Sequence, residues 1–154
     1  MSREDNIKYM FESDRIWPPV GFSAKRQRFM VALGNVLKRL PDDAFEHVED
    51  CIDFIVDDID ALALNVPFSR TFPAAGEVTI SYDQIIVFRT AFLLSDEALV
   101  GLVAHEIAHS IVCMDNHAEN EAAADATIEK WGFGEELAQL EKEKRTSVFG
   151  QTSG

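Results

Sequence analysis

Two stretches in the first part of the chain repeat apolar residues at the spacing of an α-helix. From about residue 23, where Ser23 can act as the cap, to about residue 40, one face carries Phe29, Leu33, Val36, Leu37 and Leu40. Pro41 is suited to the first turn of a second helix, which is expected to run to about residue 58. Its apolar stripe contains Phe45, Val48, Ile52, Ile55 and Ile59. Residues 1–22 lack this periodicity and are expected to form an irregular lead-in.

The pattern changes between residues 61 and 94. Three short runs rich in apolar or β-branched residues, ALALNV, GEVTISY and QIIVF, are separated by Pro, Gly and Asp. Runs of this length and composition are typical of strands. We therefore expect two or three strands of a small sheet, with QIIVF as the strand whose edge is open to a peptide.

Helical spacing returns near residue 95. Ser95 can cap a helix that carries Asp96 and Glu97 in its first turn and reaches about Cys113. A further helix is expected over about 118–131, ending before Gly132, and another over about 135–145. The last residues, 146–154, have no helical pattern and predict a mobile tail of a single domain spanning 1–154.

Charge and composition narrow the function classes. The formal net charge is −13, and it arises after residue 40, because residues 1–40 are net basic. This distribution argues against nucleic acid or an anionic membrane as the partner of the main body. The basic N-terminal part either docks on the acidic remainder or is a solvated helix face. The chain has neither an apolar run long enough to span a bilayer nor a signal-peptide core, so we expect a cytoplasmic protein.

The sequence HEIAH at residues 105–109 is the strongest candidate for chemistry. On a helix, His105 and His109 differ by only about 40° around the axis and lie one turn apart, so both imidazoles can bind one metal ion. Glu106 lies beside this pair without needing to bind the metal, where it can serve as a general base. The small residues Ala98, Gly101 and Ala108 share the histidine side and are expected to leave room for a metal and a neighbouring helix, so that this face is sterically open. The pentapeptide alone can arise by chance.

A second motif, ENEAAAD at residues 119–125, strengthens the metal hypothesis. Glu121 lies on the next expected helix and can supply a third ligand. Asp125 is one turn further on the same face and can accept a hydrogen bond from a ligand histidine, which would fix its tautomer. A solvated acidic helix face would explain Glu119 or Glu129 better than this pair.

Together, HEIAH and EAAAD resemble the HExxH…ExxAD signature of the gluzincin zinc metallopeptidases. The chain is similar to the small soluble minigluzincins and to the peptidase domain of the CAAX-prenyl-protease type, over roughly residues 76–132. The resemblance implies that His105, His109 and Glu121 bind one Zn²⁺, with Glu106 as the catalytic carboxylate and Asp125 as a support for the ligands. It also implies an α+β, zincin-like fold: a small twisted sheet of two to three strands with a backing helix, the HExxH helix and a glutamate-bearing helix.

The predicted function is therefore a zinc-dependent peptidase that cleaves peptide or protein substrates through a metal-bound water, with Glu106 as general base. Tyr82, Arg89 and His117 are candidates for stabilising the oxyanion, and the sequence does not choose among them. Two alternatives stay open. One is a non-catalytic zinc-stabilised domain in which Cys113 could fill a fourth position, although packing is the simpler role for Cys113. The other is an acidic protein-interaction module in which HEIAH is fortuitous. The oligomeric state stays open.

Overall fold

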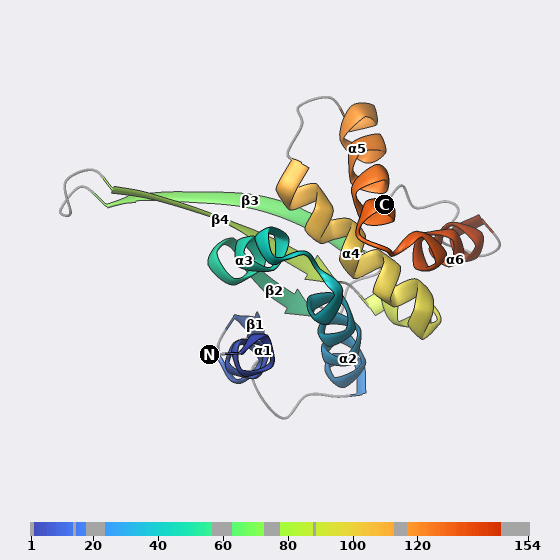
Figure 1. Cartoon of the computed structure of the whole chain (residues 1–154), viewed down its shortest axis with the longest axis horizontal. Coiled ribbons are helices and arrows are strands. Elements are labelled where there is room, and N and C mark those ends of the chain that lie inside the picture. The colour runs from blue at the N-terminus through green and yellow to red at the C-terminus, as the bar shows by residue number, and fades with distance from the viewer. Residues whose placement is uncertain are drawn as a thin grey trace.

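The computed structural model describes residues 2–13, 15–17, 24–56, 63–72, 78–87, 89–112 and 117–145. Within them the chain forms six α-helices, four strands and a 3-10 helix, arranged as Figure 1 shows. In chain order these elements are α1 (Arg3–Glu12), β1 (Ile16–Trp17), α2 (Ala24–Arg39), α3 (Asp42–Cys51), β2 (Ile52–Val56), β3 (Ala63–Phe72), β4 (Val78–Val87), η2 (Arg89–Leu93), α4 (Asp96–Val112), α5 (His117–Lys130) and α6 (Gly134–Arg145).

The strands form one mixed sheet in the order β1-β2-β4-β3. β1 pairs with β2 in parallel, β2 pairs with β4 in parallel, and β3 pairs with β4 antiparallel from Ala63↔Val87 to Phe72↔Val78. β2 covers only the part of β4 from Asp83 to Val87. The rest of β4 continues with β3 as a long two-stranded ribbon that extends away from the helices (Figure 1).

The expected fold class, an α+β zincin-like arrangement with a sheet of two to three strands, is wrong. Six helices make up most of the described chain, and the sheet has four strands in a mixed order. The described parts of two expected strands, GEVTISY and QIIVF, form one continuous strand, β4, because pairing with β3 runs through the polar Asp83 without a break. The other two strands, β1 and β2, come from segments in which no strand was expected.

The expectation of an irregular lead-in over residues 1–22 is also wrong for its described part. α1 begins with a reciprocal cap in which the Ser2 hydroxyl accepts a hydrogen bond from the Asp5 N–H and the Asp5 carboxylate accepts one from the Ser2 N–H. This satisfies two of the N–H groups that a helix start leaves free. Ile7 and Met10, three residues apart, are buried. These signals are visible in the sequence, but they lie in a helix too short to show a convincing periodicity.

The second expected helix ends earlier than predicted, at Cys51 rather than near residue 58. Ile52 adopts an extended backbone, and the chain continues directly as β2. Ile52 and Phe54 are buried and Asp53 between them is not, which is the alternation of a strand. The apolar residues after Cys51 fit both a helical and a strand period, and pairing with β1 and β4 decides between them.

The prediction that QIIVF offers an open edge is wrong as well. From Asp83 to Val87, β4 lies between β2 and β3, so both of its edges are already paired. In the described part of the sheet, β3 is the edge strand beyond β4. Pro67, which has no N–H to donate, lies in β3, as is usual for prolines in edge strands.

The hydrophobic core lies between the helices and one face of the sheet. Ile16, Phe54 and Ile85 are neighbours in register across three strands, and each is fully buried. They belong to one cluster with the stripe predicted for α2, namely Phe29, Leu33, Val36, Leu37 and Leu40. The Phe29 and Phe54 rings lie 5.7 Å apart, which joins α2 directly to β2. The predicted buried face of α2 is therefore confirmed, while Ser23, its expected cap, lies outside the described residues.

The basic N-terminal part docks on the acidic remainder, which confirms one of the two alternatives for this charge. Among the described residues, four ion pairs join the two parts: Arg3–Asp42, Arg15–Asp53, Arg28–Asp96 and Arg39–Glu136. Each arginine also donates to backbone carbonyls where a neighbouring helix ends. These acceptors are Leu37 and Leu40 for Arg3; Val48, Glu49 and Ile52 for Arg15; Phe92 and Leu94 for Arg28; and Gly132 for Arg39. Carbonyls in the last turn of a helix commonly lack partners within that helix, so the arginines stabilise helix ends as well as pairing charges.

The three C-terminal helices follow the sequence closely. α4, α5 and α6 match the helices expected over 95–113, 118–131 and 135–145 within about two residues. Gly132 has a φ of 94°, a backbone conformation that favours glycine, and it ends α5. Among the described residues, no helix is both long and apolar enough to cross a membrane. The expected mobile tail, 146–154, lies outside the described residues.

Candidate metal site

The helix α4 that carries HEIAH is held in place at its start and along its length. The Ser95 hydroxyl accepts a hydrogen bond from the Ala98 N–H, which confirms the expected cap. Ser95 in turn donates through its N–H and its hydroxyl to the Glu143 carboxylate of α6, at 2.8 and 2.5 Å. The start of α4 is thereby tied to α6.

α4 is buried around nearly its whole circumference, so the expectation of one open side is wrong. Every residue from Ala98 to Ala108 is buried. The room that Gly101 was expected to leave for a neighbouring helix is confirmed, because α6 lies so close that a Cβ at this position would be 2.5 Å from the Glu136 carbonyl oxygen. α5 also contacts α4, and Ala124 of α5 is fully buried. The histidines are therefore enclosed by protein rather than displayed on a free face.

Three predicted ligands come together between α4 and α5. The Glu121 carboxylate bridges the two histidines, with Oε2 3.2 Å from His105 Nε2 and Oε1 2.9 Å from His109 Nε2. The imidazole rings lie edge to face with centroids 4.4 Å apart. One donor atom from each of the three residues lies within 4.8 Å of the other two. The group could hold a metal ion, as the sequence predicted.

The electrostatics of the site centre on His105. Burial disfavours the charged imidazole, but hydrogen bonds and charge interactions with Glu106 and Glu121 outweigh burial and raise the pKa of His105 from 6.5 to about 10. An imidazole that holds its proton up to so high a pH lies in a strongly negative environment. The same carboxylates that hold a proton on His105 would favour a divalent cation in its place.

Glu106, the expected catalytic residue, lies inside the protein next to His105. Its side chain is 8% exposed, and its Oε1 lies 3.7 Å from His105 Nδ1. Nδ1 is the ring nitrogen on the opposite edge from the Nε2 that faces Glu121. A buried carboxylate needs a charged or hydrogen-bonding partner, and His105 lies close enough to be one. The buried position of Glu106 in this cluster therefore supports a role in the site more strongly than its place in the motif does.

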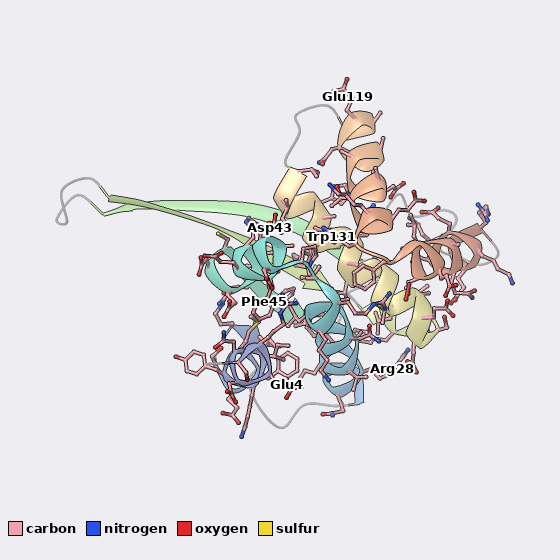
Figure 2. All side chains as sticks on the ribbon, viewed as in Figure 1. Glu4, Arg28, Asp43, Phe45, Glu119 and Trp131 are labelled. Carbon is pink, nitrogen blue, oxygen red and sulfur yellow. The ribbon has the colours of Figure 1, made fainter. Side chains whose placement is uncertain are left out.

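Asp125, predicted as an outer partner of a ligand histidine, also faces Nε2 of His105. Its Oδ1 lies 3.2 Å from this nitrogen. Within the described part of the chain, Oδ1 is buried and accepts no hydrogen bond, although the side chain as a whole is 43% exposed. Burial and the charges of Glu121 and Glu141 raise the pKa of Asp125, against the lowering effect of the two histidines. Glu119, two residues before Glu121, is exposed and points outward at the start of α5 (Figure 2).

The chemistry of this donor set fits zinc. Zn²⁺ is bound in proteins by histidine nitrogens and carboxylate oxygens, often by two histidines and a glutamate in hydrolases. The buried Asp125 Oδ1 without a hydrogen bond is the kind of atom that a cation would satisfy. His105, His109 and Glu121 would hold the ion, with Asp125 beside Nε2 of His105.

Several predicted residues cannot be placed relative to the site. The side chains of Tyr82, Arg89 and His117, the candidate oxyanion donors, lie outside what the structure describes, although the backbone of each is described. Cys113, considered as a fourth ligand, lies wholly outside the described residues. Their roles stay predictions.

One polar contact beside the site had no signal in the sequence. His47 Nε2 of α3 lies 2.9 Å from Ser110 Oγ of α4. Ser110 directly follows His109 in the chain. A cavity of about 600 Å³ adjoins His47 and is bounded on another side by Trp131, which Figure 2 labels. Only the packing of α3 on α4 brings His47 and Ser110 together, so no local spacing could have indicated the pair.

Comparison with known proteins adds no family assignment. The chain matches no protein-family model, no curated protein and no solved structure. The candidate site therefore stands on its residues and their geometry.

Proposed function

We propose that this protein is a zinc-dependent peptidase whose metal is held by His105, His109 and Glu121. The observation that carries the proposal is the convergence of these three donors on two packed helices, with the Glu106 carboxylate buried beside the first histidine. Three protein ligands are the number that catalytic zinc sites use, since one position has to stay available. The gluzincin-like spacing of the motifs supports the same conclusion.

The protein side chains divide the work. Zinc, when bound, supplies a Lewis acid that polarises a carbonyl and acidifies water. Glu106 accepts the proton of the attacking water and delivers it to the leaving amine, a role that typically contributes about 10²- to 10⁴-fold in rate. Its burial beside His105 keeps the carboxylate away from bulk water, which strengthens its interactions with charges that develop in the site.

A peptide substrate has a suitable surface near the site. β3 contacts α4 and is the edge strand beyond β4. An extended peptide can add to such an edge through main-chain hydrogen bonds. Pro67 removes one donor from β3, so the pairing would be interrupted there.

The test compares Glu106→Gln with Glu97→Gln, an exposed glutamate on the same helix. Both proteins are loaded with zinc, their metal content is measured, and cleavage of an unstructured protein is followed. Glu106→Gln should keep zinc and lose at least about 100-fold in turnover, because it removes the proton acceptor but no ligand. Glu97→Gln should behave as wild type. A Glu106→Gln variant with unchanged turnover would rule out the proposed chemistry.

A zinc-stabilised domain without hydrolytic activity is the second candidate. The observation that favours it is a fourth candidate ligand, the Asp125 carboxylate, whose Oδ1 lies 3.2 Å from His105 Nε2, since structural zinc sites use four protein ligands. Stoichiometric zinc with strong stabilisation but no cleavage by the wild-type protein would support it. An acidic interaction module would instead bind no stoichiometric zinc.

A further inference from the structure

We infer that Asp125 is a direct, fourth ligand of the metal rather than an outer partner of a ligand histidine. The inference rests on the metal site of the proposed function, but not on peptide hydrolysis. It changes the donor set from two histidines and one carboxylate to two histidines and two carboxylates.

The first argument is the atom that Asp125 approaches. An outer carboxylate orients a ligand histidine by accepting from the ring nitrogen that does not bind the metal. In this structure Asp125 Oδ1 is 3.2 Å from His105 Nε2, the nitrogen that also faces Glu121 Oε2 at 3.2 Å. The other ring nitrogen of His105, Nδ1, lies 3.7 Å from Oε1 of Glu106. Asp125 therefore lies on the metal side of the ring.

The second argument is the unsatisfied oxygen. Among the described residues, Oδ1 of Asp125 is buried and accepts no hydrogen bond, although a donor nitrogen is close. A buried acceptor without a hydrogen bond destabilises the folded protein, and a charged one does so more strongly. Coordination of a cation by Oδ1 would remove this destabilisation, whereas an outer role would require a hydrogen bond that the structure does not contain.

The third argument is helix geometry and charge. His105 and His109 are one turn apart on α4, and Glu121 and Asp125 are one turn apart on α5, so each helix directs two donors into the same space. Asp125 contributes one of three carboxylates, with Glu121 and the buried Glu106, whose negative charge favours a divalent cation between the two helices.

The consequence concerns access to the metal. A catalytic site keeps one position open, and a fourth protein ligand occupies that position unless it leaves or the coordination number increases. Of the four donors, Asp125 has the most exposed side chain, at 43%. The exposed fractions of the others are 8% for His105, 11% for His109 and 33% for Glu121. It is therefore the ligand best placed to move away when a substrate arrives.

The experiment measures zinc affinity, by competition with a chromophoric chelator, and the absorption spectrum of the Co²⁺-loaded protein. Asp125→Asn keeps the shape of the side chain, and Asp125→Ala removes it. The matched control is Glu129→Gln, which removes one negative charge from an exposed position one turn further along α5. Circular dichroism of each metal-free protein shows that it is folded.

If Asp125 is a ligand, Asp125→Ala should lose more than the roughly 10- to 100-fold in zinc affinity that removal of an outer partner costs, and the Co²⁺ bands should shift because a donor has changed. Asp125→Asn should show the same spectral shift with a smaller loss, and Glu129→Gln should match wild type in both measurements. Weaker binding with an unchanged Co²⁺ spectrum, or unchanged affinity, would overturn the inference and leave the three-ligand site intact. Failure of the wild-type protein itself to bind zinc or Co²⁺ would overturn the metal site and, with it, the proposed function.

Discussion

Substitution of Gly101 by Ala tests how closely α6 packs against the helix that carries the metal ligands. A Cβ at Gly101 would lie 2.5 Å from the carbonyl oxygen and 2.8 Å from the carbonyl carbon of Glu136, where ordinary contacts begin at 3.4 Å. The obstructing atoms belong to the backbone of α6, so no side-chain rotation can relieve the clash. α4 and α6 would have to separate by about 0.9 Å.

The magnitude follows from two opposing effects. Replacing glycine by alanine inside a helix favours folding by up to about 1 kcal/mol. Forcing extra volume into a well-packed contact typically costs about 1–3 kcal/mol. The helices that would move apart bury Leu137 and Leu140 of α6, so the separation also weakens core contacts. Gly101→Ala should therefore destabilise the protein by about 1–2 kcal/mol, despite the better helix former.

Gly34→Ala is the matched control, because Gly34 also lies inside a helix, α2. There a Cβ would meet the Phe11 ring at 3.6 and 3.7 Å, which is an ordinary contact. Without a clash, the helix preference should prevail and stabilise the protein by about 0.4–1 kcal/mol. The two substitutions, identical in chemistry, should thus have effects of opposite sign.

Urea unfolding followed by circular dichroism measures both variants against wild type. The unfolding midpoint should fall for Gly101→Ala and rise for Gly34→Ala, with similar slopes for all three proteins. If Gly101→Ala raised the midpoint as Gly34→Ala does, α6 would not lie as close to α4 as described. The enclosure of the histidines by α6 would then be wrong too.

Three further predictions concern the metal ligands, a helix cap and pH. Replacing His105, His109 or Glu121 by Ala should in each case remove most of the bound zinc, as measured by dialysis and metal analysis; full affinity after Glu121→Ala would contradict its assignment. Arg15→Met should lower the free energy of unfolding by about 2 kcal/mol because three backbone carbonyls lose the guanidinium as a donor, although Val48 O keeps the Ile52 N–H. Arg15→Lys, which keeps the charge, is the control, and equal losses in the two variants would show that the guanidinium geometry is unimportant. Burial acts to raise the pKa of Glu143, but hydrogen bonds from Ser95 at the α4 cap prevail and lower this pKa below 4.5. The ionised Glu143 carboxylate therefore stabilises the fold above pH 4.5. This stabilisation is lost as the pH falls through the lowered pKa. The stability difference between wild type and Glu143→Gln should therefore vanish in acid-unfolding curves at low pH, and a constant difference would contradict this origin.

The core of the candidate site could be predicted from the sequence because it depends on local geometry. Helical spacing alone places His105 beside His109 and Glu121 beside Asp125. The cap at Ser95 and the glycine at Gly132 fix where these helices begin and end, and both signals were readable. What spacing could not give was the direction from which α5 approaches α4, and this direction decides which ring nitrogen Asp125 faces.

The fold was less predictable, and its errors have a common cause. The residues after Cys51 suit a helix and a strand almost equally, and hydrogen bonds to β1 and β4 select the strand. β1 has only two residues, too few for any pattern, and exists because β2 lies beside it. The strand order β1-β2-β4-β3 likewise depends on which edges remain free after pairing.

The helices α2 and α4 to α6, the face that α2 buries, and the residue types able to hold a metal could all be predicted from the sequence. These features depend on contacts within about four residues, which the helical period encodes directly. Tertiary structure decided the sheet, the enclosure of α4 and the partners of the arginines. Arg15, for example, binds carbonyls more than 30 positions away at the end of α3. Hydrogen bonds and packing between distant segments produce no periodic pattern in the sequence, because the sequence around one partner does not depend on where the other partner lies.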